Sequence, residues 1–465
     1  MKKRNDIRTP QPPLGGVMGL MRPIRSIGLI GLICLIVLMG LWSCSKEQVE
    51  VRRTASVELM SYARIFTDED PDTRGETRRT GWAPDGYLPY NKLTGADIIE
   101  MTNENAAIGV FFTKDLPTTT QEQRKFRYGS DETWRMNEDL EGGGDYYLYG
   151  YVPLDAATVS IAPDAETGNY ADGARLTFSG LSSVMSKDIC VLVGAKEGRT
   201  AELTDTYTEV TVTVGVTIVT GLYTRSGEVE PYTYTEIITP NTKAAAETTY
   251  YRKDDLAIGK FGVHINVGED EDIHNYLFLL FDHIYSALSF QFKISETYYT
   301  LRTIKVKKLE LRAYSDETCT TPMKKYQTMT IALKAKTDGS TPLPSSFTFT
   351  PDESSGDIGY VLIYENAENP VELTPNRYSD MIGFVPRNAN YFILRSTYDV
   401  YDRAGNLVRK DCTAENRINL RTLFNQDYLE YGHRYIVKLL VEPTYLYQLS
   451  EPDLDNPVIK LTGNS

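Results

Sequence analysis

Alternation of apolar and polar residues at a period of two is the strongest pattern in the chain. Leu288, Phe290, Phe292 and Ile294 alternate with polar residues, and from Val210 to Ile218 valine or isoleucine alternates with threonine or with Gly215. Successive side chains of a strand point to opposite faces, so this spacing predicts strands that are buried on one face. Gly215 is interpreted as a bulge within one long strand.

A third segment has the same pattern with an interruption. Ile304 and Val306 are followed, after a slip of one residue, by Leu309, Leu311 and Ala313, which predicts a bulge near Lys307 or Lys308. Asp402 to Asn406 is typical of a hairpin turn. Further strands are predicted at 108–112, 146–152, 329–335, 360–364, 391–401 and 435–441, and short helices only near 118–124 and 420–429.

The strand pattern predicts an all-β protein with two antiparallel β-sandwich domains in tandem. We expect the first sandwich at residues 81–297 and the second at 298–465, after a leader at 1–43 and an N-terminal lipid-linked segment at 44–80. Between Gly221 and Gly259 the pattern weakens, which is interpreted as an insertion, with the alternative that this stretch is the linker.

The leader has the features of a bacterial export signal. Its apolar run, Ile27 to Trp42, is shorter than the roughly 20 residues of a membrane span and follows a basic stretch. Leu41-Trp42-Ser43-Cys44 resembles a lipobox, which predicts that Cys44 is acylated and becomes the first residue. The alternative is an ordinary signal peptide with a cysteine nearby by chance, and Met21 is an alternative start.

Charge and cysteine usage narrow the function classes. Loss of the leader, with six basic residues and one acid, takes the formal charge from −14 to −19. Such an acidic chain is repelled by phosphate backbones and anionic lipid, so we expect no nucleic-acid partner. The later cysteines, Cys190, Cys319 and Cys412, form neither a disulfide framework nor a C-x-x-C site.

The sequence offers little catalytic chemistry. The histidines form no H-x-x-x-H pattern, and no G-x-S-x-G or P-loop motif is present, so we expect no enzyme and no cofactor. A hydrolase with paired carboxylates remains an alternative. His283 is expected to be a hydrogen-bonded residue at a strand end. The acidic cluster 68–72 lacks the glycine and closing glutamate of an EF-hand, so it is interpreted as a solvated loop and no metal site is expected.

Tyrosine is abundant, with 32 residues in the chain. Tyr147, Tyr149 and Tyr151 would lie on one side of a predicted strand. This row is interpreted as a cross-strand or inter-sheet stack, with a sugar-binding platform as the alternative.

Four stretches together resemble the fimbrillin family, the subunits of Gram-negative type V pili. They are WRMNEDLEGGGDYYLYGYVP, KDICVLVGAK, FDHIYSALSFQFKI and YGHRYIVKLLVEPT, which follow the lipobox and an arginine-bearing polar loop in this order. The resemblance implies two transthyretin-like sandwiches, export as a lipoprotein, removal of an N-terminal strand by an arginine-specific protease, and polymerisation by strand insertion.

The residues can be compared with that scheme. Val57, Leu59, Ala63 and Ile65 alternate in a candidate removable strand, and Arg74 and Arg79 lie in the polar segment that follows as candidate cleavage sites. Val458, Ile459 and Leu461 form a candidate donor strand in the C-terminal tail. The alternative is that the tail simply completes the second sandwich.

The sequence therefore predicts a structural or adhesive subunit, in the shaft, tip or an accessory position, of a pilus assembled by strand insertion. Its expected partners are other pilus subunits in an open head-to-tail polymer, outer-membrane lipid through the acylated Cys44, and an unidentified surface receptor. Its expected location is the outer-membrane surface and, after processing, the fimbrium. The alternative is a permanently lipid-anchored surface protein that binds glycan or peptide.

Overall fold

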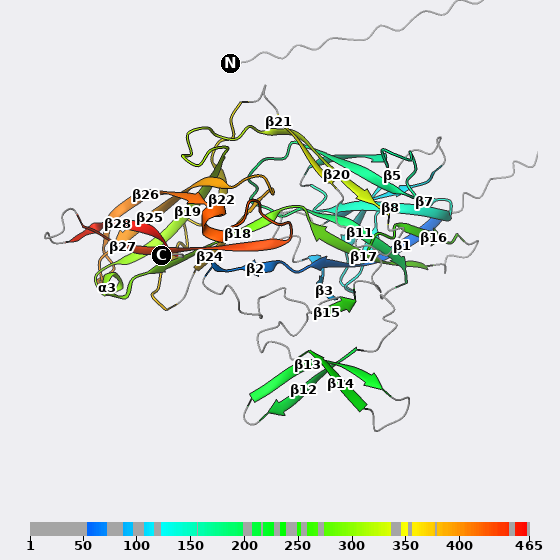
Figure 1. Ribbon diagram of the computed structural model, residues 1–465, viewed down its shortest axis with the longest axis horizontal. Coiled ribbons are helices and arrows are strands. Elements are labelled where there is room, and N and C mark those ends of the chain that lie inside the picture. Colours follow the sequence, from blue (N-terminus) through cyan, green and yellow to red (C-terminus); the bar gives the residue numbers. More distant parts are fainter. Residues whose placement is uncertain are drawn as a thin grey trace, which may run out of the picture. The chain divides into compact units, whose positions relative to one another are not determined.

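The computed structural model describes residues 54–71, 87–95, 107–115, 122–155, 157–198, 207–214, 217–226, 233–238, 249–252, 258–267, 274–335, 346–351, 356–376, 379–445 and 452–462. The predicted leader, Cys44, Arg74 and Arg79 lie outside these residues. Strands make up most of the described chain, which confirms the prediction of an all-β protein (Figure 1). Within the described part, no helix combines the length and apolarity that a membrane span needs.

Seven strands of the first region close into a barrel. In order around the ring they are β1 (Thr54–Arg64), β17 (His274–His283), β11 (Cys190–Glu197), β8 (Gly144–Val152), β4 (Ala107–Thr113), β5 (Glu122–Tyr128) and β6 (Trp134–Met136), and β6 pairs back to β1. Four strands extend this sheet: β3 (Tyr87–Lys92), β7 (Leu140–Glu141), β15 (Thr249–Arg252) and β16 (Gly262–Ile265). The predicted first sandwich is thus not confirmed, because ring closure, which alternation cannot reveal, decides the architecture.

A four-stranded sheet shares the apolar core of the barrel. It consists of β21 (Ser346–Pro351), β20 (Tyr326–Lys334), β10 (Gly173–Ser179) and β9 (Thr158–Pro163). This second layer explains why barrel strands such as β4 are buried at every position rather than at alternate ones. Tyr149 and Tyr151 are both buried, and Tyr151 packs edge-on against Phe178 of β10 at 5.5 Å between ring centroids. These two tyrosines therefore belong to the core rather than to a sugar platform.

The second region has two five-stranded sheets around one core. One contains β2 (Thr67–Glu69), β27 (His433–Tyr445), β18 (Ser286–Ile294), β24 (Ser379–Val385) and β28 (Pro452–Thr462). The other contains β22 (Val361–Glu365), β19 (Thr303–Tyr314), β25 (Tyr391–Tyr401), β26 (Leu407–Asn419) and β23 (Val371–Glu372). Two short helices, α3 (Glu296–Tyr299) and α4 (Leu420–Phe424), flank these strands.

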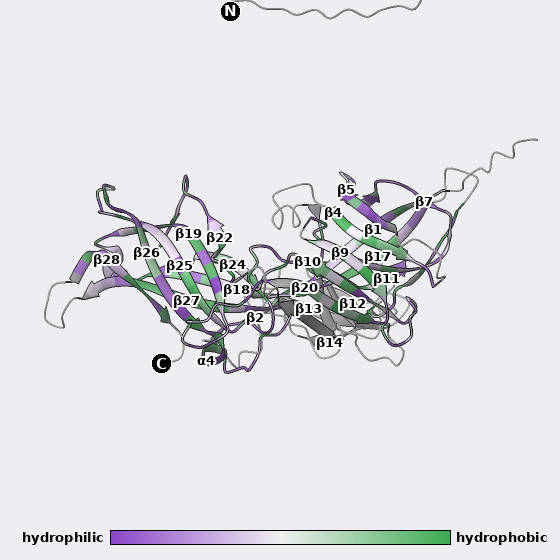
Figure 2. Ribbon diagram, turned by 90° about the horizontal axis from the view of Figure 1, so that it is seen from above, coloured by the Kyte–Doolittle hydropathy of each residue, from purple (hydrophilic) through white to green (hydrophobic). Residues whose placement is uncertain are grey.

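Several local predictions are confirmed in the second region. The four apolar residues of β18 that alternate with polar ones are fully buried, and the register of β19 against β25 shifts between Val306 and Lys308, where the bulge was expected. Apolar and polar residues alternate along these strands (Figure 2). Asp402 accepts hydrogen bonds from the backbone N–H groups of Ala404 and Asn406, which fixes the turn between β25 and β26.

Two local predictions are wrong. The stretch from Val210 to Ile218 is not one strand, because β12 (Tyr207–Val214) and β13 (Thr217–Ser226) pair antiparallel with Val214 opposite Thr217. β14 (Thr233–Ile238) joins them in a three-stranded sheet. The helix expected near 118–124 is replaced in its described part by β5, which is paired on both sides by β4 and β6. Pairing with the strands on both sides overrides local helix propensity there.

The predicted domain boundary at 297/298 is crossed by strand pairing in both directions. β18 lies before it and pairs with β27, whereas β20 lies after it and pairs with β10. The domain limits themselves stay a prediction.

Candidate functional site

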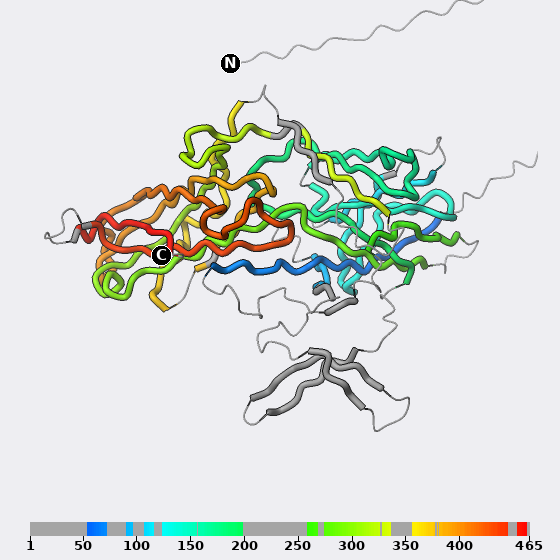
Figure 3. Tube along the Cα trace, viewed as in Figure 1, coloured from blue at the N-terminus to red at the C-terminus, as the bar shows by residue number. Residues whose placement is uncertain are grey.

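The candidate functional site is the seat of segment 54–70, which comprises β1, β2 and the residues that flank β2. β1 is paired along both of its edges. On one side it runs parallel to β17 from Ser56 to Ala63, and on the other it meets β7, β6 and β3 in succession. Figure 3 traces the segment as one continuous run from its pairing with β17 to the pairing of β2 with β27.

Side chains of β1 alternate between the core and the other face. Ala55, Val57, Leu59 and Ser61 are each at most 2% exposed, whereas the residues between them are half-buried. The predicted inward positions Val57 and Leu59 are therefore in the core. Ala63 is half-buried and packs against it, and Ile65 lies beyond the end of the strand. Segment 54–70 supplies part of the barrel interior.

The junction between β1 and β2 is held by His283 at the end of β17. Its Nε2 lies 2.6 Å from the backbone carbonyl oxygen of Arg64, and its Nδ1 lies 2.6 Å from Oδ2 of Asp188. The ring of Phe66 stacks on the imidazole with 3.6 Å between centroids. His283 is thus a hydrogen-bonded residue at a strand end, as the sequence predicted.

The two partners of His283 determine its protonation. A backbone carbonyl and a carboxylate oxygen can only accept, so each ring nitrogen must donate and the ring carries a positive charge. Burial lowers the pKa of His283, but the negative charge of Asp188, its hydrogen bond and the Arg64 carbonyl outweigh burial, and the pKa is raised above 6.5. A buried ion pair therefore anchors the junction.

The same cluster contains Cys190, whose Sγ lies 3.3 Å from Nδ1 of His283. In a cysteine nucleophile–base pair, the orienting carboxylate binds the ring nitrogen that the thiol leaves free. Here Asp188 and Cys190 face the same nitrogen, and the other nitrogen is bound to Arg64. Burial raises the pKa of the Cys190 thiol well above 9.0, which leaves it unreactive. The arrangement is a clamp on the backbone and not a catalytic triad.

Asp188, Cys190 and His283 are also the one group of metal-ligand residue types that lie close together in the described chain. A metal ion needs an unprotonated ring nitrogen. Both ring nitrogens of His283 instead face oxygen acceptors at 2.6 Å, which is the length of a charge-assisted hydrogen bond. The geometry therefore fits a protonated imidazole rather than a metal ligand.

Beyond the junction, the acids of segment 54–70 pair with bases of β27. Asp68 accepts two hydrogen bonds from Arg434, at 2.6 and 2.7 Å, and Lys438 donates to both carboxylate oxygens of Asp70, at 2.8 and 2.9 Å. Glu69 lies 3.2 Å from Nδ1 of His433. The interpretation of 68–72 as a solvated loop is wrong for these residues, because Asp68 is only 9% exposed and lies in β2.

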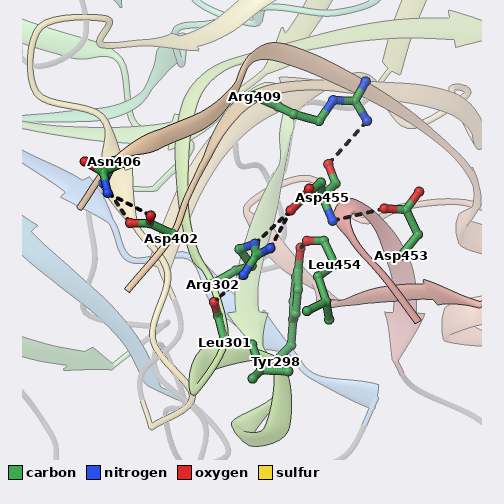
Figure 4. A network of polar contacts seen from close by, with 9 residues as sticks. All are labelled: Tyr298, Leu301, Arg302, Asp402, Asn406, Arg409, Asp453, Leu454 and Asp455. Carbon is green, nitrogen blue, oxygen red and sulfur yellow. Dashed lines mark hydrogen bonds and ion pairs between the residues drawn. The ribbon is translucent and has the colours of Figure 1, made fainter. Parts of the chain in front are cut away.

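The C-terminal tail is part of the second region in this chain. β28 pairs antiparallel with β27, Ile459 is 6% exposed, and Leu461 and Val458 are half-buried. At the start of β28, Arg302 donates two hydrogen bonds to Asp455 Oδ1, at 2.9 and 2.7 Å (Figure 4). Tyr298 donates to the Leu454 carbonyl at 2.6 Å. The tail completes a sheet here, and its role as a donor strand stays a prediction.

Sequence reasoning missed the residues that hold segment 54–70. Asp188, Arg434 and Lys438 were not singled out. One signal was available, because Arg434 and Lys438 are cations in the otherwise apolar stretch 434–441 of β27, and such residues require nearby anions when part-buried. The contact of Asp188 with His283 joins residues 95 apart and had no local signal.

Known proteins and solved structures provide a comparison for this chain. No family model and no curated protein matches the chain. Matching solved structures include proposed cell-adhesion proteins and fimbrial proteins. A proposed cell adhesion protein from Bacteroides fragilis is 12% identical over 89% of this chain and 98% of that one, with a TM-score of 0.32. A second, from Bacteroides uniformis, is 8% identical over 89% and 99%, with a TM-score of 0.31. The fimbrial anchor protein Mfa2 from Porphyromonas gingivalis is 10% identical over 87% and 98%, with a TM-score of 0.21.

These solved structures carry the names of adhesion and fimbrial proteins, which is the class of protein that the sequence resemblance implies. At these TM-scores the likeness carries no functional weight.

Proposed function

We propose that this protein is a structural or adhesive subunit of a surface pilus that assembles by β-strand insertion. The observation that carries the proposal is the seat of segment 54–70. β1 forms part of the wall of a closed barrel, and the polar stretch with Arg74 and Arg79 follows the segment at once. A cut there would separate a strand from the sheet that it completes.

Loss of β1 would leave a slot with two unpaired edges. Neighbouring strands lie about 4.8 Å apart, so β17 and β6 would face each other across about 10 Å, which is the width that one strand fills. Both edges would present backbone N–H and C=O groups, and the inner face would lose Val57 and Leu59. Such a slot favours a replacement strand from another chain over an open edge.

In this proposal the protein reaches the outer-membrane surface through a lipid on Cys44, and an arginine-specific protease then cuts at Arg74 or Arg79. The slot receives a strand from another subunit, and this chain's own tail, with Val458, Ile459 and Leu461 as its apolar face, is the donor strand for the next subunit. The tandem transthyretin-like organisation belongs to the same proposal. The contact is head to tail and open, so repetition gives a filament.

N-terminal sequencing of the assembled surface form tests the proposal. The expected first residue is Gly75 or Thr80, and the double variant Arg74→Ala/Arg79→Ala is expected to remain acylated and monomeric. Arg417→Ala, which removes an exposed arginine outside the polar stretch, is the matched control. A filament whose subunits all begin at an acylated Cys44 would overturn the processing step.

A second candidate function is a permanently anchored protein that binds glycan. It is favoured by an open cavity of about 250 Å³ in the second region, with Tyr299, Tyr401, Lys305 and Arg403 in its lining. Lys305 and Arg403 lie over the rings of Tyr401 and Tyr299, at 5.1 and 4.8 Å from the centroids. Tyr401→Ala should abolish binding on a glycan array if this function holds, whereas Tyr428→Ala, an exposed ring elsewhere, should not.

A further inference from the structure

The seat of segment 54–70 has two chemically different halves. The half within the barrel receives small and aliphatic side chains at alternate positions, from Ala55 to Ser61. The half along β27 presents the cations Arg434 and Lys438, together with His433. Apolar contacts do not discriminate strongly between aliphatic strands, but placed charges do.

The charged half is partly buried, which increases its influence on binding. Asp68 and Arg434 side chains are 13% and 27% exposed, and those of Asp70 and Lys438 are 16% and 10% exposed. Both carboxylates bind through charge-assisted hydrogen bonds, and Arg434 makes a bidentate contact. An incoming strand without these carboxylates would leave the cations of β27 without these partners in a part-buried place.

An aromatic contact lies between the two halves. Phe66 stacks on the charged ring of His283, and its ring centroid is 6.1 Å from that of Phe384. Phe66 precedes Asp68 by two residues and Asp70 by four. The seat therefore holds three side chains of segment 54–70 in a fixed order. The aromatic ring of Phe66 comes first, followed by the carboxylates of Asp68 and Asp70 at intervals of two residues.

We propose that the strand that replaces segment 54–70 comes from a different subunit and carries this same order of side chains after its apolar stretch. The inference rests on the proposed function, because it names the partner of that slot. The chain's own tail has the opposite order, with Asp453 and Asp455 before Val458 and Ile459. A donor that keeps the parallel pairing with β17 and the antiparallel pairing with β6 must run in the chain direction of segment 54–70, and in that direction this tail would place its apolar residues against Arg434 and Lys438. A slot that keeps these pairings therefore selects a heterologous neighbour.

Peptide exchange into the full-length chain tests this selection. A site for a specific protease is inserted between residues 72 and 86, the chain is cut there, and a labelled peptide with the sequence of residues 54–71 competes with the nicked segment. Because the inserted site replaces natural cleavage, a failure to cut at Arg74 or Arg79 would count against the processing step alone.

The native-sequence peptide is expected to exchange in, and the peptide with Asp68→Asn and Asp70→Asn to bind about tenfold more weakly. The protein variant Arg434→Gln should weaken the native peptide but leave the affinity for the neutral peptide nearly unchanged. A simple loss of fold would weaken both. Arg395→Gln, which removes an exposed ion pair with Glu415, is the matched control and should change neither affinity.

A peptide of residues 452–462 provides the competing occupant. It is expected to bind more weakly than the native-sequence peptide. Three results would each overturn the proposal: equal binding by the neutral and native peptides, tighter binding by the tail peptide, or no incorporation of the native peptide when the nicked chain is unfolded in urea and refolded with it.

Discussion

His283 donates a hydrogen bond to the backbone carbonyl oxygen of Arg64, with 2.6 Å between Nε2 and the oxygen. The contact joins the last residue of β17 to the last residue of β1. Arg64 also places its guanidinium 3.7 Å from Asp282, and Tyr90 donates to the same carboxylate at 3.1 Å. The end of β1 is therefore fixed by both its backbone and its side chain.

The charge on His283 makes this attachment dependent on pH. Its pKa is raised on folding, so the folded state holds the proton more tightly than the unfolded chain does. The stabilisation is fully present below about pH 6.5, the ordinary value, and is lost as the pH rises through the folded-state pKa. Urea unfolding between pH 6 and pH 9 should show wild type losing stability relative to His283→Gln, which does not titrate.

In the described structure, the titratable groups that act on His283 are Asp188, Cys190 and Asp282. The pKa of the Cys190 thiol is raised above 9.0, so the thiol stays neutral over this range. A stability difference between wild type and His283→Gln that does not change with pH would contradict a charged imidazole.

Removal of the carboxylate charge at Asp68 should destabilise the folded chain. Asp68→Asn breaks a bidentate contact with Arg434 in a part-buried place, and the expected cost is about 2 kcal/mol in the free energy of unfolding. Glu415→Gln is the comparison, because its ion pair with Arg395 is exposed and should be worth less than about 1 kcal/mol. If chemical denaturation showed that both variants lower the free energy of unfolding equally, burial of the Asp68 pair would add no stability.

Truncation of Leu59 should be more costly. This side chain is completely buried in the barrel, so Leu59→Ala leaves a cavity and is expected to lower the free energy of unfolding by about 3 kcal/mol. Leu407 is 48% exposed, and Leu407→Ala should change stability by no more than about 0.5 kcal/mol. If Leu59→Ala were as mild as this control, β1 would not be a core strand.

The tail should loosen without unfolding the protein when its first anchor is removed. Asp455→Ala deletes the acceptor of Arg302, and the backbone amides of residues 458–461 should then exchange hydrogen faster. The Asp455 side chain is 44% exposed, so overall stability should change by less than about 1 kcal/mol. Glu372→Ala, which removes another exposed ion pair, should leave exchange of the tail unchanged.

The sequence predicted strands well where one face is buried. The bulge in β19 and the turn at Asp402 follow from local spacing, and both are present. The inward positions of β1 were also predicted from alternation. In each case the pattern depends only on residues that are neighbours in the chain, so the local sequence suffices to reveal it.

Long-range pairing was not predictable in the same way. The return of β6 to β1, which closes the barrel, brings Trp134 opposite Leu59, and alternation says nothing about which strands become neighbours. The acids at 68–70 resemble a solvated loop in sequence because their cations lie more than 360 residues away in the chain. Charge complementarity at this separation becomes visible only when β2 and β27 are paired.

Closure of the ring also affects how fast β1 can leave. A strand at a sheet edge peels away one hydrogen bond after another, but β1 has neighbours on both sides, so its release must disrupt two ladders together. We therefore expect a high kinetic barrier to departure even after the chain is cut. A nicked monomer would persist in a metastable form at the surface, so polymer growth would begin only where a donor strand arrives to replace β1.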